Sequence, residues 1–139
     1  MSSRRWRESG GGSLIRLAAH PVGAALYLKR VEGVRRNGEP IVPVAVTAEI
    51  GPLGTVAAAN GTVARQILHE WEDVEDWGSI LLTFSDGTKA VLGGSDVQLG
   101  GLQSYLDLTL SNGLITCRLS PTDLCRAYAP DEITWGAVI

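Results

Sequence analysis

The stretch from Tyr105 to Leu119 limits the possible folds of this chain more than any other part of its sequence. At its centre, Asn112-Gly113 is the dipeptide that a two-residue type I′ hairpin turn requires, because both turn residues need a positive φ. A turn there gives one wholly apolar face, made of Leu106, Leu108, Leu110, Ile115, Cys117 and Leu119. The other face carries a Thr109–Thr116 pair and an Asp107–Arg118 pair. A shift of one residue would destroy both faces, so the sequence predicts this antiparallel hairpin.

A second hairpin is expected nearer the N-terminus. Asn37-Gly38, flanked by Arg36 and Glu39, has the composition of another two-residue turn, with strands expected over 24–35 and 41–50. A shorter strand is expected over 14–18, because Pro21 disfavours one continuous helix through this region. Pro40 and Pro43 cannot donate to a β-ladder, so the returning strand is predicted at a sheet edge.

A third hairpin is predicted from Ser79 to Leu92. Ser85-Asp86-Gly87 fits a three-residue loop in which Gly87 adopts a left-handed conformation. This loop pairs Phe84 with Thr88, Leu82 with Ala90 and Ile80 with Leu92. The larger apolar side chains then lie on one face of the hairpin.

Residues 65–77 fit two alternatives. Helical spacing places Ile67, Leu68, Trp71 and Val74 on one stripe, whereas strand spacing places Ile67, His69 and Trp71 on one face. We prefer the strand, because acidic residues crowd the end where a helix dipole disfavours them. Farther along, Ser120-Pro121-Thr122-Asp123 has the residues of a capped helix start and predicts a helix near 120–128. A last apolar strand is expected over 133–139.

Length and composition fit one globular domain. A chain of 139 residues with 45% hydrophobic and 19% charged residues can bury a core, and it is not a disordered chain. It contains no apolar run of membrane-spanning length and no secretory signal, so we expect a cytoplasmic protein, or one built into a particle assembled in the cytoplasm. The elements predict a mainly β (α+β) fold, an antiparallel β-barrel or sandwich of about seven or more strands with one short helix.

Residues 1–13 are predicted to form a basic, glycine-rich arm that precedes a single β-rich domain over 14–139. The arm combines Arg4, Arg5, Trp6 and Arg7 with a run of three glycines. We expect it to contact another chain, with Trp6 as an apolar anchor and the arginines facing carboxylates. Nucleic acid is the less favoured partner, because a nucleic-acid-binding domain is usually basic overall and this chain has a net charge of −3.

Charge is distributed unevenly along the chain. Residues 1–36 carry eight Lys or Arg against two Glu, whereas residues 37–139 carry four against thirteen acidic residues. This polarity favours attraction between copies of the chain. We interpret four acidic residues as a partner-facing patch: Glu72, Asp73, Glu75 and Asp76.

No motif for catalysis, metal binding or nucleotide binding is recognisable. His69-Glu70 begins like a zinc-protease helix, but the residue four positions after His69 is Asp73, and the only other histidine is His20. Gly93-Gly94 lacks the spacing and the following helix of a phosphate-binding loop. We therefore expect no cofactor and no metal, and we assign no catalytic residue.

The two cysteines, Cys117 and Cys125, are interpreted as buried small hydrophobic residues. A disulfide between them is disfavoured in an intracellular protein. A nucleophilic Cys–His pair that uses His20 or His69 stays an alternative, because sequence does not show proximity in space.

Three functions follow from these observations. The leading hypothesis is a non-enzymatic subunit of a larger assembly, such as a phage-type virion or a similar homo-oligomeric particle. The second is a small soluble binding or inhibitor protein, of the kind that blocks a toxin or a defence enzyme, which would use the acidic patch. The third is a small hydrolase that uses His69 with a carboxylate or a cysteine.

Overall fold

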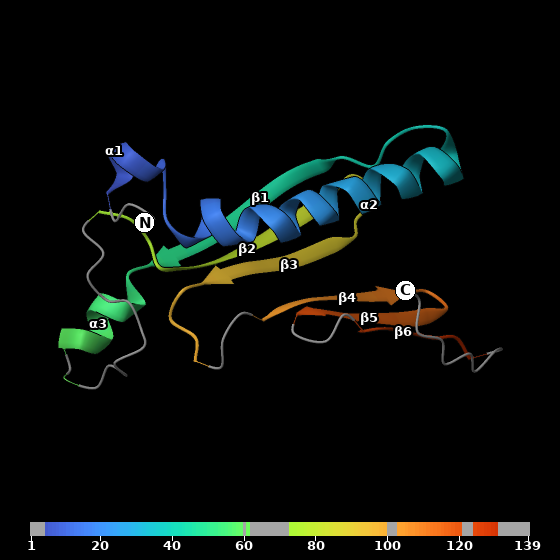
Figure 1. Ribbon diagram of the computed structural model, residues 1–139. Coiled ribbons are helices and arrows are strands. Elements are labelled where there is room, and N and C mark those ends of the chain that lie inside the picture. The colour runs from blue at the N-terminus through green and yellow to red at the C-terminus, as the bar shows by residue number, and fades with distance from the viewer. Residues whose placement is uncertain (1–4, 60, 62–72, 100–102, 121–123, 131–139) are drawn as a thin grey trace. The chain divides into compact units, whose positions relative to one another are not determined.

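The computed structural model describes residues 5–59, 61, 73–99, 103–120 and 124–130, in two units that divide after Leu99 (Figure 1). These residues form six strands in two antiparallel three-stranded sheets, and one long helix. The mainly β, α+β class is therefore confirmed, whereas the predicted barrel or sandwich of about seven strands is not. No helix in the described part of the chain is long and apolar enough to cross a membrane.

The first unit is a three-stranded sheet with a long helix along one face. The sheet has the order β1 (Pro43–Gly51), β2 (Trp77–Phe84), β3 (Lys89–Ser95). Its helical segments are α1 (Trp6–Ser9), the π-helical turn η1 (Leu14–Ala18), α2 (Ala19–Asn37) and α3 (Leu53–Ala59). Figure 1 shows α2 lying along the sheet. The core between them contains Ala25, Ile41, Leu82, Phe84 and Leu92.

Helix α2 corrects the strand predicted over 24–35, and η1 corrects the strand predicted over 14–18. The residues that contact the sheet include Val22 and Ala25, which are spaced for one face of a helix. Pro21 does not interrupt the helix because it lies in the first turn of α2. There the hydrogen-bond pattern changes from π to α, and one missing N–H is tolerated.

Asn37-Gly38 ends α2 and does not form the predicted hairpin turn. Gly38 has a φ of 79°, and its N–H donates to the carbonyl of Val34 at 3.1 Å. Arg36 pairs with Glu32, one helical turn earlier, at 2.6 Å, and not with Glu39. A helix C-terminus and a type I′ turn both need a left-handed residue, so this dipeptide alone cannot distinguish them.

The predicted edge position of β1 and the predicted β2–β3 hairpin are confirmed. Strand β1 lies at an edge of its sheet, as its prolines indicate. The β2–β3 hairpin has the predicted register, with Leu82 opposite Ala90 and Ile80 opposite Leu92. Its loop has Gly87 at a φ of 84°.

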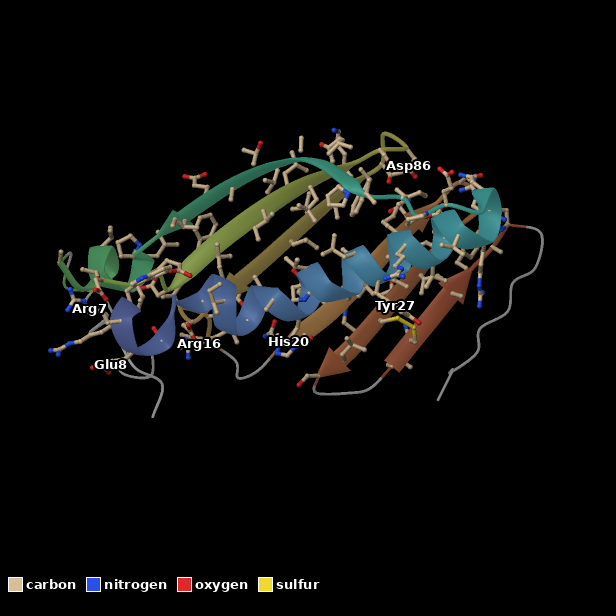
Figure 2. The ribbon with its side chains drawn as sticks, turned by 90° about the horizontal axis from the view of Figure 1, so that it is seen from above. Arg7, Glu8, Arg16, His20, Tyr27 and Asp86 are labelled. Atoms are coloured by element: carbon tan, nitrogen blue, oxygen red, sulfur yellow. A yellow bond between two sulfur atoms is a disulfide. The ribbon has the colours of Figure 1, made fainter. Side chains whose placement is uncertain are left out.

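Lys29 connects the second half of α2 to the β2–β3 hairpin through a salt bridge. Its ammonium group lies 2.8 Å from the carboxylate of Asp86 in the loop and 5.8 Å from the centre of the Phe84 ring. Figure 2 shows Asp86 at the tip of this hairpin, beside α2. The hydrogen bond from Lys29 holds the pKa of Asp86 well below its ordinary value.

The second unit is a sheet with the order β4 (Ser104–Leu110), β5 (Gly113–Ser120), β6 (Leu124–Tyr128). The predicted β4–β5 hairpin is present, but Leu110 pairs with Gly113, so Ser111-Asn112 forms the turn and the assignment to Asn112-Gly113 is wrong. The register differs from the predicted one by two residues, and an even shift keeps the same side chains on each face. Arg118 still reaches Asp107 at 2.8 Å, now along a diagonal.

Strand β6 corrects the helix predicted near 120–128. The proposed cap residues 121–123 lie outside the described residues, and Leu124–Tyr128 pairs with β5. A helix that short is only marginally stable by itself, so pairing with a neighbouring strand decides its conformation. The ambiguous residues 65–72 and the strand predicted over 133–139 also lie outside the described residues.

Two glycines of α2 give a direct test of this packing. A Cβ at Gly33 would lie 2.4 Å from the backbone nitrogen of Ile41, whereas a Cβ at Gly23 would meet no atom within 4 Å. We expect Gly33→Ala to lower the free energy of unfolding by about 1–3 kcal/mol, because the helix must move away from residues 39–41. Gly23→Ala should raise it by about 0.5–1 kcal/mol, because alanine favours the helix.

Urea denaturation of both variants measures these changes. Equal midpoints for the two variants would contradict the placement of α2.

Candidate functional site

Three carboxylates of the first unit gather where η1, α3 and the ends of the strands meet. Glu75 and Asp76 directly precede β2, and Asp96 directly follows β3. The backbone N–H of Asp96 donates to the carbonyl of Asp76 at 2.8 Å, which joins the two segments. We call these three residues the carboxylate cluster.

Glu75 holds the N-terminal segment. Its carboxylate accepts hydrogen bonds from the N–H of Gly12 at 3.1 Å and of Leu14 at 3.0 Å. Its backbone carbonyl accepts the N–H of Ser13 at 2.9 Å. A Cβ at Gly12 would lie 1.7 Å from this carbonyl oxygen, so only glycine fits there. Glu75 therefore satisfies the first free N–H groups of the helical segment that begins at Ser13.

Asp76 is fully buried and holds α3. One carboxylate oxygen accepts the N–H of Leu53 at 2.7 Å, and the other accepts the N–H of Gly54 at 2.8 Å. Its own N–H donates to the carbonyl of Gly51 at 3.3 Å. Asp76 thereby connects the end of β1, the start of α3 and the start of β2.

Asp96 completes the cluster. Its carboxylate accepts the hydroxyl of the buried Ser13 at 2.5 Å and forms a salt bridge with Arg16 of η1. Arg16 supplies a positive charge to the cluster, and Figure 2 shows its position in η1. A partly buried acidic group such as Asp96 needs such partners, because desolvation of a charge is otherwise expensive.

Burial raises the pKa of Asp76, and the negative charge of Asp96 raises it further. The hydrogen bonds from the Gly54 and Leu53 amides act in the opposite direction but do not cancel the effect of burial.

The carboxylate cluster mainly serves to connect elements of the fold. Its carboxylate oxygens accept hydrogen bonds from groups of the same chain, which leaves them poorly placed to bind a substrate. The described residues contain no group of three His, Cys, Asp or Glu side chains that could hold a metal ion. Ser13, Arg16 and Asp96 were not predicted from the sequence, in which the only signal for them is the glycine run that allows this close packing.

Most of the partner-binding residues predicted from sequence lie near this cluster. Arg5, Trp6 and Arg7 are exposed, and Trp6 has 56% of its surface exposed. The N–H of Trp6 donates to the carboxylate of Asp73 at 2.6 Å. Asp73, Glu75 and Asp76 thus contact their own chain, while Arg4 and Glu72 lie outside the described residues.

The nucleophilic Cys–His pair considered from the sequence lacks a free thiol in this structure. His20 is exposed in the first turn of α2, four residues after Arg16 (Figure 2). Cys117 and Cys125 lie directly opposite each other on β5 and β6 and form a disulfide, contrary to the prediction of two buried thiols. No cysteine thiol is available for a Cys–His pair in this state, and His69 lies outside the described residues.

The face of the β1–β3 sheet opposite α2 is a second candidate site. Thr47, Leu81 and Val91 form one row across the three strands on this face. Leu81 is 38% exposed and Val91 is 78% exposed. A shallow, open depression beside them is lined by Thr47, Ala48, Glu49, Ser79 and Leu81. We call this surface the open sheet face.

Comparison with known proteins informs the fold. No protein-family model matches the chain, and no curated protein matches it. A crystal structure of an oxidoreductase domain protein from Kribbella flavida is similar, with a TM-score of 0.64 and 19% sequence identity. The similarity covers 99% of this chain and 35% of that one, so the chain spans about a third of its length. At this identity, the likeness shows the fold alone.

The raised pKa of Asp76 predicts how stability changes with pH. A protonated Asp76 stabilises the folded state below the ordinary carboxyl pKa of 3.8, and this contribution is lost as the pH rises through the higher folded value. The stability of the wild-type protein relative to Asp76→Asn should therefore fall as the pH rises from below 3.8 toward neutrality.

Asp86→Asn is the matched control, because the pKa of Asp86 is lowered. The stability of the wild type relative to this variant should rise with pH up to the ordinary carboxyl pKa of 3.8 and level off above it. Urea denaturation across the pH range measures both differences. The same sign of pH dependence for the two variants would contradict the assignment.

Proposed function

We propose that this chain is the helix-backed sheet module of an oxidoreductase-type protein, and that it works as an assembly surface. The name of the similar structure suggests the oxidoreductase setting. The sequence lacks a nucleotide-binding fingerprint, which makes the chain better suited to structural support than to holding a dinucleotide.

The open sheet face is the observation that carries this proposal. Helices cover one face of the β1–β3 sheet, and the other exposes the side chains of Leu81 and Val91 beside Thr47 and Ser79. Such a mixture of apolar centre and polar surroundings is typical of protein interfaces. The occupant that we propose is a second copy of the chain, because a symmetric pair can join two identical faces, here through the row of Thr47, Leu81 and Val91.

This proposal keeps the assembly role expected from the sequence but not the phage-type particle, which no other observation supports. The inhibitor alternative is less favoured, because it depends on an acidic patch of which Asp73, Glu75 and Asp76 bond to their own chain.

Light scattering on the purified full chain tests the assembly role. We expect the wild type to have the mass of a dimer or a larger oligomer, and Val91→Asp to shift it toward the monomer, because a buried unpaired charge opposes association. Val46→Asp is the matched control, since Val46 is 65% exposed but lies on the other side of the sheet.

Circular dichroism must show that both variants fold. A monomeric wild type, or equal masses for Val91→Asp and Val46→Asp, would overturn the proposal.

A further inference from the structure

The disulfide between Cys117 and Cys125 lies at the edge of the second unit. Cys117 belongs to the middle strand β5 and Cys125 to the outer strand β6, and the two residues are register partners. The disulfide is the yellow bond in Figure 2. They are the only two cysteines of the chain. Any redox chemistry of its thiols therefore involves this bond.

Strand β6 depends strongly on its connection to β5. It is only five residues long, and Arg126, Ala127 and Tyr128 are exposed. Among residues 103–120 and 124–130, no side chain is fully buried, so the described part of this unit contributes no closed core. The β5 ladder and the disulfide are the connections of β6 that the structure describes.

The bond is also open to attack. Both cysteines are partly exposed, and the outer strand leaves the Cys125 side of the bond without a further strand beyond it in the described sheet. A thiolate, which is the species that attacks disulfides, can therefore approach the bond from this side.

We propose that Cys117–Cys125 is a redox site that a dithiol reductant opens and that controls the attachment of β6. A thiolate of the reductant attacks Sγ of Cys125, the Sγ–Sγ bond breaks, and Cys117 leaves as a thiolate that takes up a proton. The second thiol of the reductant then attacks the mixed disulfide and releases Cys125. Two electrons and two protons pass to the chain, and the reductant ends as a disulfide.

Reduction is expected to loosen β6 and to leave the first unit unchanged. The connection that remains is a short edge ladder, and strands of this kind open more readily than strands in a packed core. This role does not depend on the proposed assembly function, because the open sheet face belongs to the other unit.

Alkylation and hydrogen exchange of the full chain test the proposal. Without reductant, iodoacetamide should add no mass, and after dithiothreitol under native conditions it should add two adducts. Reduction should also speed amide exchange in residues 124–130 by about tenfold or more, while residues 77–84 in β2 serve as the internal control.

The double variant Cys117→Ala/Cys125→Ala provides a second measurement. It should exchange in β6 as the reduced wild type does, and dithiothreitol should not change it further. Free thiols in the untreated protein, resistance to native reduction, or unchanged exchange in β6 after reduction would each overturn the proposal.

Discussion

The hydrogen bonds that the carboxylate cluster accepts are the constraint on which the first unit depends. Glu75 fixes the start of the helical segment, Asp76 fixes the start of α3, and Asp96 binds Ser13 and Arg16. Removing an acceptor from a buried N–H costs about 1–3 kcal/mol, so each of these contacts is large beside the stability of a small domain. Because η1 leads directly into α2, the cluster also fixes where α2 begins on the sheet.

The cluster explains why the glycine run and the acidic run occur in one chain. Gly12 lies so close to the backbone of Glu75 that no side chain fits between them, and Gly11 has a φ of 150°. From the sequence, we predicted that the glycine run and the acidic run each bind a partner, since glycine and acidic residues are common in exposed segments. Their pairing within the chain depends on contacts across more than sixty positions, which periodicity and composition do not reveal.

Local signals predicted the hairpins better than the helices. Ser85-Asp86-Gly87 determined the β2–β3 register, because strand alternation on both sides agreed with the loop. Asn37-Gly38 was misinterpreted, because a helix end and a hairpin turn need the same left-handed residue. The turn lies one residue earlier than predicted, at Ser111-Asn112. Gly113 instead allows β6 to approach, because a Cβ there would lie 2.6 Å from the carbonyl oxygen of Tyr128.

Amide hydrogen exchange at Gly12 and Leu14, followed by NMR in Glu75→Ala and in Glu39→Ala, tests the role of the carboxylate cluster most directly. Glu39 is an exposed residue between α2 and β1 and serves as the control. We predict that Glu75→Ala accelerates exchange at both amides and lowers the free energy of unfolding by about 1–3 kcal/mol, while Glu39→Ala leaves the exchange unchanged and alters the free energy by no more than about 0.5 kcal/mol. Equal protection of Gly12 and Leu14 in the two variants would contradict the account.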